Sequence, residues 1–312
     1  MEALILTLTV NPAIDRTITV DRLAFEDRAY ITSMHDSAGG RGIHASCVIH
    51  SFGGDTMAIM PAGGKSGARF EEYLRNCGFP YEIVPIRKPL RTNLAITDKQ
   101  GLTAKLNEAG PPIEKAELAR IEKAVTGKLG DATWLMICGS LPPGVPSHFY
   151  AQLVKAARNR GVKTLLDADG EALRHGIEEG PTVVTPNQSE AERLLNRTLL
   201  TRAQFLEAAA TIQGMGAESV ILSLGSRGAV AASGGVLEEF LPPRVDAVCP
   251  IGAGDAMAAV FVWAMEGKRG FSDAVRWGVA AGTASARLHG LRFASLAQTE
   301  EIYQHVEVRR VE

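Results

Sequence analysis

The sequence predicts an α/β protein with a mainly parallel central sheet, helices on both faces and a small β-strand lid. Short β-branched or apolar runs alternate with amphipathic stretches over more than half of the 312 residues, an order typical of parallel sheets covered by helices. Two stretches break this alternation and have no helical partner. No linker rich in Pro, Gly or Ser divides the chain, so we expect one domain over residues 1–312.

The central elements are expected in the second half of the chain. The predicted strands are Thr133–Cys138, Val162–Asp167, Thr182–Thr185 and Ser219–Ser223. Helical periodicity covers Ser147–Arg160, Gln188–Asn196 and Arg202–Met215. The longest apolar run, Ala256–Met265, is about half of a membrane span, so it predicts a buried helix.

The lid is predicted from two segments, approximately residues 13–37 and 89–107. In the second segment, two alternating strands meet at a Lys-Gln-Gly turn at residues 99–101. We interpret both segments as a small antiparallel flap over the ligand-binding edge of the sheet. Ligands of open α/β sheets bind outside the carboxyl ends of the strands, and a flap there excludes water.

Net charge, cysteine spacing and the first residues exclude several classes of partner and site. The formal net charge is −2, which predicts no basic face and hence neither nucleic acid nor an anionic membrane as a partner. The four cysteines, Cys47, Cys77, Cys138 and Cys249, form no CxxC pair, so neither a disulfide framework nor a zinc site is expected. The opening Met1-Glu2 has no basic region like that of a signal peptide, and we expect a reducing, cytoplasmic location.

The strongest chemical signal is the segment 251–257, Ile-Gly-Ala-Gly-Asp-Ala-Met, at the start of the long apolar helix. The small residues Gly252, Ala253 and Gly254 let backbone amides point at an anion from a helix N-terminus. Asp255 then lies where a carboxylate can accept a proton from a substrate hydroxyl while the amides stabilise the transferred phosphoryl group. The alternative is that Asp255 only caps the helix.

Six motifs in this order resemble those of the ribokinase-like (PfkB) carbohydrate kinases, in the phosphofructokinase and tagatose-6-phosphate kinase branch. They lie at residues 7–15, 38–44, 139–144, 186–190, 223–228 and 251–257. The resemblance covers nearly the whole chain. It implies a ribokinase-like three-layer α/β/α sandwich and ATP-dependent phosphorylation of a ketohexose phosphate, with Mg²⁺ accompanying ATP. Fructose 6-phosphate or fructose 1-phosphate is favoured, giving fructose 1,6-bisphosphate, and tagatose 6-phosphate is a third candidate.

The resemblance assigns the sugar side of the site. Asp15 would hold sugar hydroxyls, Gly39 and Gly40 would allow close backbone approach to the ligand, and Ser140 follows the carboxyl end of a buried strand. Taken alone, the glycines could equally form a plain tight turn, and the alternative for Asp15 is a surface turn aspartate.

Positive charge on the sugar side is expected from arginines. Arg91 matches the residue that grips the substrate's phosphate, since a guanidinium fork fits phosphate oxygens. Arg28 and Arg41 would add positive potential there. A solvated arginine on the flap is the alternative for Arg91.

The resemblance also assigns the nucleotide side. The ATP-binding residues would be Asn187, Ser223, Gly225, Gly228, Gly254 and Gly282. Asn187 and Glu190, three residues apart at a helix start, would hold Mg²⁺ mainly through water, because this ion dehydrates reluctantly. A capping box formed by the same two residues is the competing interpretation.

The sequence departs from the family pattern at several positions. His44 stands where most relatives have asparagine as a sugar ligand, Thr185 where lysine is frequent, and Pro250 where threonine or serine is common. Arg41 replaces a lysine and keeps the charge. These departures leave the sugar specificity open.

Other classes of function match parts of the sequence. Gly63-Gly64-Lys65-Ser66 imitates the end of a P-loop, but Ile59 stands where the first glycine of that motif belongs. A kinase of unphosphorylated sugars or nucleosides and an inactive sugar-sensing protein stay as alternatives. We further expect a homodimer through the lid, whose strands offer an edge for pairing, and the resemblance allows for a monovalent cation such as K⁺.

Overall fold

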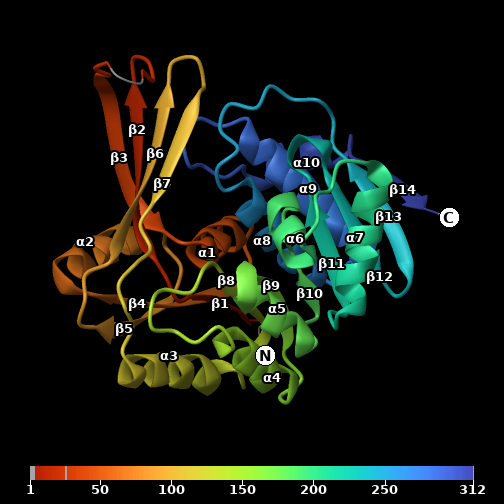
Figure 1. Ribbon diagram of the computed structural model, residues 1–312, viewed down its shortest axis with the longest axis horizontal. Helices are drawn as coiled ribbons and strands as arrows, with labels where there is room; N and C mark the ends of the chain where they lie inside the picture. Colours follow the sequence, from red (N-terminus) through yellow and green to blue (C-terminus); the bar gives the residue numbers. More distant parts are fainter. Residues whose placement is uncertain (1–3, 25–26, 312) are drawn as a thin grey trace.

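The computed structural model describes residues 4–24 and 27–311. The opening Met1-Glu2, on which the expectation of no signal peptide rested, and residues 25–26 of the first lid segment lie outside these ranges. The described residues form a 10-stranded sheet and a 4-stranded sheet, and the smaller sheet rises from the body as a separate blade (Figure 1). None of the described helices is both long and apolar enough to cross a bilayer.

The larger sheet forms the body, with strand order β14-β13-β12-β11-β10-β9-β8-β1-β4-β5. Its strands are β1 (Leu4–Thr9), β4 (Thr56–Gly63), β5 (Tyr81–Ile86), β8 (Ala132–Cys138), β9 (Lys163–Asp167), β10 (Val183–Val184), β11 (Ser219–Ser223), β12 (Ala229–Ser233), β13 (Val236–Leu241) and β14 (Glu307–Val311). All neighbouring pairs from β11 to β5 are parallel, and β12, β13 and β14 add antiparallel pairs at one edge. The predicted mainly parallel sheet is therefore confirmed.

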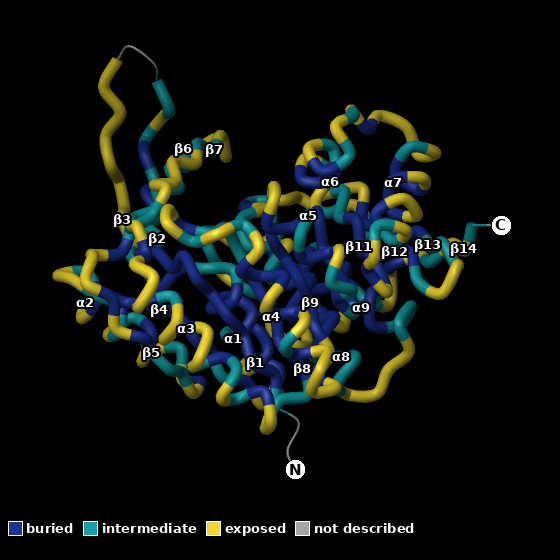
Figure 2. Tube along the Cα trace, turned by 60° about the horizontal axis from the view of Figure 1, so that its bottom comes forward, coloured by how far each residue is buried: buried dark blue, intermediate teal, exposed yellow. Residues whose placement is uncertain are grey.

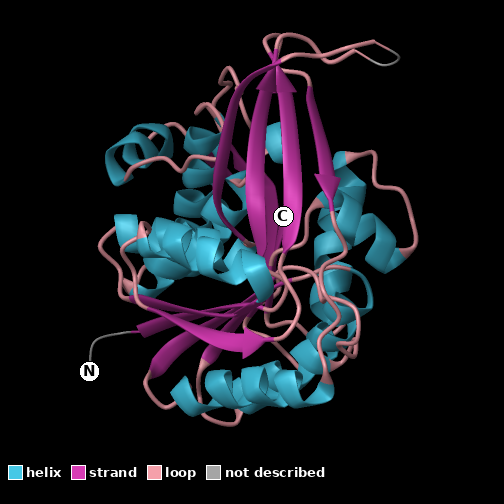
Figure 3. Cartoon of the chain, turned by 90° about the vertical axis from the view of Figure 1, so that its left-hand side faces the viewer, coloured by secondary structure: helices cyan, strands magenta, loops and turns pink. Residues whose placement is uncertain are grey.

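Helices cover both faces of this sheet (Figure 3). One face carries α1 (Arg41–Ser51), α8 (Ala253–Glu266), α9 (Phe271–Ala286) and α10 (Leu296–Tyr303). The other carries α2 (Gly64–Arg75), α3 (Lys115–Lys128), α4 (Phe149–Arg158), α5 (Gly170–Glu178), α6 (Gln188–Leu195) and α7 (Arg202–Gly214). Strand β8 shows why both faces of the sheet need a cover of helices. Trp134 and Met136 enter one core while Leu135 and Ile137 enter the other, because successive strand side chains point to opposite faces. The predicted three-layer α/β/α architecture is confirmed.

The predicted elements lie close to the observed ones. Strand β11 has the expected bounds, and the buried helix predicted from the apolar run is α8. Helix α4 begins at Phe149, two residues later than expected, and β10 is shorter than the predicted strand at Thr182–Thr185. Element type was therefore predictable from apolar patterning, whereas termini shifted by one or two residues.

The lid is the 4-stranded sheet, in the order β3-β2-β6-β7. Its strands are β2 (Ala13–Val20), β3 (Ile31–Gly39), β6 (Arg91–Asp98) and β7 (Thr103–Asn107). The pairs β2–β3 and β6–β7 are antiparallel, which confirms the predicted antiparallel flap in its two outer pairs, whereas the central pair β2–β6 is parallel. Strands β2 and β6 follow closely after β1 and β5, which are parallel members of the body sheet, so both leave the same sheet edge in the same direction. The lid backbone is largely half-buried or exposed, in contrast to the buried body strands (Figure 2).

Candidate active site

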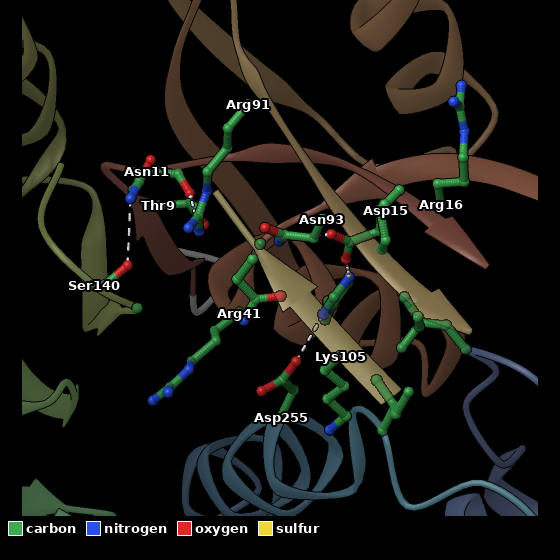
Figure 4. A pocket seen from close by; sticks show the side chains of 18 of the residues that line it. Thr9, Asn11, Asp15, Arg16, Arg41, Arg91, Asn93, Lys105, Ser140 and Asp255 are labelled. Atoms are coloured by element: carbon green, nitrogen blue, oxygen red, sulfur yellow. Dashed lines mark hydrogen bonds and ion pairs between the residues drawn. The ribbon is translucent and has the colours of Figure 1, made fainter. Parts of the chain in front are cut away.

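A cavity of about 260 Å³ lies between the lid and the carboxyl ends of the body strands (Figure 4). The lid supplies Asp15, Arg16, Arg91, Asn93 and Lys105. The body supplies Asn11, Arg41, His44, Ser140, Asp169 and Asp255. The fold thus brings residues from both ends of the chain to one site, and most of the sugar-side residues expected from the sequence are among them.

Asp15 points into the cavity from β2 and is built into a tight environment. Its Oδ1 accepts a hydrogen bond of 2.9 Å from Asn93 Nδ2 on the neighbouring strand β6. A Cβ at Gly39 would lie 2.1 Å from the Asp15 Cγ, so any larger residue at this position of β3 would displace the carboxylate from its present place. Gly40, with φ of 138°, similarly leaves no room for a Cβ beside Thr9. The expected close approach at both glycines is therefore to side chains of the protein itself, Asp15 and Thr9.

Asp255 lies at the start of α8, in the turn predicted to hold an anion. Gly252 has φ of 81°, in the left-handed region, and directs the chain into the helix. The Ala253 amide was expected to be free, but it donates to the Pro250 carbonyl at 3.3 Å. The amides of Gly254 and Asp255 have no acceptor within residues 4–24 and 27–311. The Asp255 carboxylate faces the cavity and contacts His44, so it is not occupied in capping its own helix.

His44 on α1 lies between the two acids. Its Nδ1 is 2.6 Å from Asp255 Oδ2, and its Nε2 is 3.3 Å from Asp15 Oδ2, an ion-pair contact outside good hydrogen-bond geometry. Burial by itself would lower the pKa of His44, but the two carboxylates outweigh burial and raise the pKa to about 10. The ring is therefore positively charged at neutral pH.

Two cations face the cavity without a carboxylate partner among the described residues. Arg91 donates at 2.8 Å to the backbone carbonyls of Glu108 and Asn11, and burial lowers its pKa. Lys105 on β7 lines the cavity and has no ion pair there. Sequence reasoning missed Lys105, because a single lysine in an alternating strand resembles any solvated lysine.

The remaining arginines lie differently from expectation. Arg28 is exposed in the loop between β2 and β3 and does not line the cavity, so its predicted place on the sugar side is wrong for the described chain. Arg16 lines the cavity but is bound bidentately to Asp36. Arg41 pairs with Asp167 at 2.7 Å and with Glu190 at 3.1 Å. The pKa of Arg41 is raised by these acids, chiefly by Asp167.

A second, more open depression of about 530 Å³ adjoins the first across Arg41. It is lined by Asn187, Ser223 and Gly225, three of the residues expected on the nucleotide side. Gly228 and Gly282 are not among its lining residues. A Cβ at Gly228 would lie 1.9 Å from the Phe240 carbonyl oxygen, and one at Gly282 would lie 2.8 Å from the Ala253 carbonyl oxygen. In the structure both glycines permit close packing.

Asn187 and Glu190 form the capping box that was the competing interpretation. The Asn187 side chain accepts from the Glu190 amide, and Glu190 accepts from the Asn187 amide at 2.9 Å. Arg41 contacts the other Glu190 oxygen. The described residues contain no group of three or more His, Cys, Asp or Glu that could hold a metal. This donor set fits Mg²⁺ held through water and nucleotide phosphates, but not a cage of protein ligands.

A helix-covered parallel sheet with a lid over an acid and free helix-start amides is the arrangement of a small-molecule kinase. Residues 8–298 match the model of the pfkB family carbohydrate kinases. The chain therefore belongs to the pfkB family, which confirms the class expected from the resemblance, an ATP-dependent sugar kinase.

Individual relatives agree with this family. The chain is 31% identical to ATP-dependent 6-phosphofructokinase isozyme 2 of Escherichia coli, over 97% of this chain and 98% of that protein. It is 28% identical to 1-phosphofructokinase of Borreliella burgdorferi, over 91% and 92% of the two chains. The Escherichia coli structure in complex with fructose-6-phosphate superposes with a TM-score of 0.89 at 32% identity, over 97% and 99% of the chains. Structures of that protein with potassium and in a tetrameric inhibited form are also similar. Ribokinase of Arabidopsis thaliana, 19% identical with a TM-score of 0.75 over 97% and 99%, shares the ribokinase-like fold.

Proposed function

We propose that this kinase transfers the terminal phosphoryl group of ATP to a hydroxyl of a ketohexose phosphate. Fructose 6-phosphate and fructose 1-phosphate are the favoured acceptors, and fructose 1,6-bisphosphate is the product. The observation that carries the proposal is the meeting of Asp255, the free amides of Gly254 and Asp255, and two cations without acid partners at one cavity. Relatives that act on phosphorylated fructose support the same substrate class.

Each residue of the cavity has a separate role in the proposed phosphoryl transfer. Asp255 accepts the proton of the attacking hydroxyl, and the Gly254 and Asp255 amides stabilise charge on the transferred group. Asp15 and Asn93 hold sugar hydroxyls under the lid, with Ser140 at the end of β8. When bound, Mg²⁺ neutralises charge on the ATP phosphates. Asn187, Ser223 and Gly225 would line the nucleotide site, with Glu190 contacting the ion through water. A bound K⁺ stays an expectation, supported by the potassium complex of the relative.

Preference for a phosphorylated sugar follows from charge. Arg91 and Lys105 face the cavity without carboxylate partners among the described residues. Arg91 is half-buried, and a half-buried cation is costly unless an anion accompanies it. A phosphate on the substrate supplies that anion. A kinase of free sugars or nucleosides, the alternative function, has no use for two such cations.

The base is tested with Asp255→Asn. Turnover should fall by about 10²- to 10⁴-fold while ATP binding stays nearly unchanged, because the amide cannot accept the proton. The matched control is Asp131→Asn, an exposed aspartate outside the cavity, which should leave both quantities unchanged. Turnover of D255N close to that of the unchanged enzyme would refute the mechanism.

Substrate class is tested with a panel of free and phosphorylated ketohexoses. Arg91→Ala and Lys105→Ala should each raise KM for phosphosugars by about 10-fold or more, the loss of a charged hydrogen bond, and leave KM for free sugars unchanged. Lys99→Ala, at the exposed tip of the same hairpin, is the control. Equal losses with free and phosphorylated sugars would favour the alternative function.

We also propose a homodimer formed through the lid. Large apolar side chains are exposed on and beside the edge strands: Tyr30, Ile31, Met34, Leu102 and Leu106, each more than half exposed. An edge strand with exposed apolar side chains pairs readily with another copy. Sedimentation should give a dimer that Met34→Lys weakens. A strictly monomeric mass at assay concentrations would contradict the proposal.

A further inference from the structure

His44 has a carboxylate at each ring nitrogen. Nδ1 is 2.6 Å from Asp255 and Nε2 is 3.3 Å from Asp15, and the three side chains are only 8%, 14% and 17% exposed, in the order His44, Asp255, Asp15. Ionised carboxylates accept hydrogen bonds and donate none. Neutral imidazole carries a proton on one nitrogen only, so it would turn a lone pair toward one of the acids. The imidazolium is the form that satisfies both contacts.

The surroundings of His44 favour the charged ring. The charged groups in contact with it are Asp15 from β2 and Asp255 from α8, and Arg41 lies one turn earlier on its own helix. Cys77 follows α2, and the pKa of its thiol is lowered first by a hydrogen bond from Cys47 and also by the charge of His44. The Phe293 ring packs near the imidazole, at 5.5 Å between centroids, and contributes no charge. The two acids in contact with the ring favour its charged form and hold the proton on it.

We propose that His44 is a positioning residue: its imidazolium ties the Asp15 carboxylate on the lid to the Asp255 carboxylate on the catalytic helix. The inference rests on the proposed function, in which Asp255 is the base. Because His44 contacts Oδ2 of Asp255, Oδ1 is left to face the substrate hydroxyl. Nδ1 is hydrogen-bonded to Asp255 and Nε2 faces Asp15 in an ion pair, so the charged ring offers the sugar no acceptor. This role differs from that of a sugar ligand, which the resemblance assigned to the position.

An asparagine at this position could not do the same. Its side chain carries one amide nitrogen and one carbonyl oxygen, so spanning the two acids would turn the carbonyl toward one of them. Glutamine can reach one carboxylate with its NH₂ but brings no charge. The proposal therefore predicts that neither amide replaces His44, although asparagine is the residue of most relatives.

The first test measures the charge of His44 without turnover. Histidine ring signals of the labelled protein are followed by NMR from pH 5 to 10, and the His44 signal is the one of seven that disappears in His44→Asn or, if that variant does not fold, in His44→Gln. The His44 ring should stay protonated at pH 8. His50, exposed at the end of the same helix, supplies a comparison signal in the same spectra. A His44 ring that loses its proton below pH 7 overturns the proposal.

The second test is kinetic. In H44N and H44Q, kcat should fall by about 10- to 100-fold, the usual effect of removing a group that orients a catalytic ligand, and ATP affinity should stay the same. The unchanged enzyme should lose activity as the pH approaches 10, and that alkaline loss should be absent from both variants. His50→Asn is the control and should match the unchanged enzyme.

The outcomes separate the two proposals. Superimposable pH profiles for H44N and the unchanged enzyme would overturn the positioning role. Full turnover in D255N would instead refute the proposed base and leave the NMR result on His44 valid. A loss of activity in H44N with the alkaline limb retained would mean that His44 only supports the fold.

Discussion

The contact between Gly39 and Asp15 allows one substitution to separate sugar binding from stability. In Gly39→Ala the new methyl group would lie 2.1 to 2.4 Å from the carboxylate atoms of Asp15. The backbone of Gly39 does not require glycine, because it is not among the residues with positive φ. The clash is with the end of a side chain, so Asp15 can rotate away and the fold should be kept.

The expected loss is one charged hydrogen bond to the sugar. Asp15 would also leave Asn93 Nδ2 and His44 Nε2, now 2.9 and 3.3 Å away. A hydrogen bond to a charged group contributes about 1.5–3 kcal/mol, which corresponds to a rise of about 10- to 100-fold in KM for the sugar. The affinity for ATP should be unchanged, since the nucleotide depression contains neither residue.

Steady-state kinetics with varied sugar and calorimetric titration with ATP measure the two effects separately. The matched control is Gly127→Ala on α3, an exposed glycine with open space around its Cβ position. This change should leave KM alone and stabilise the protein slightly, by up to about 1 kcal/mol. An unchanged sugar KM in G39A would show that Asp15 does not bind the sugar.

Three further outcomes are expected. Gly228→Ala should destabilise the protein by about 2–4 kcal/mol in denaturant unfolding, because φ is +90° and the Cβ would lie 1.9 Å from the Phe240 carbonyl oxygen; an unchanged midpoint would contradict the packing role. The free energy of unfolding should decrease between about pH 6.5 and 10, because the raised pKa of His44 makes the folded state bind the proton more tightly than the unfolded state. In H44N the free energy of unfolding should decrease less over this pH range. The pKa of the Cys77 thiol is lowered, first by a hydrogen bond from Cys47 and also by His44. Iodoacetamide should therefore modify Cys77 faster than buried Cys249, as followed by mass spectrometry. The reverse order of modification would show that Cys77 is protonated.

The sequence alone was sufficient to predict the architecture and the turn at the start of α8. Alternating apolar runs predicted the parallel sheet because burial on both faces requires apolar strands. The segment 251–257 predicted a helix start with Asp255 near an anion site, because small residues at a helix N-terminus leave amides free. These signals are local, and local patterns can be recognised without knowing which segments meet.

Long-range contacts could not be predicted in the same way. The arginine at position 41 was expected to face the sugar, but it also pairs with Asp167 and Glu190, more than 120 residues away. Lys105 and Asn93 enter the cavity because two lid strands happen to turn these faces inward. No periodicity distinguishes such residues from solvated ones.

The sequence by itself determined the class of fold, the kind of enzyme and the acid at the helix start, because each depends on residues that are neighbours along the chain. Only the tertiary structure decided that β2 and β6 run parallel and that His44 lies between Asp15 and Asp255. Asp15 and Asp255 are far apart in sequence, and the folding of the lid against α8 brings both within reach of one imidazole. The charge of that imidazole follows from this encounter, since an isolated histidine is largely neutral at pH 7.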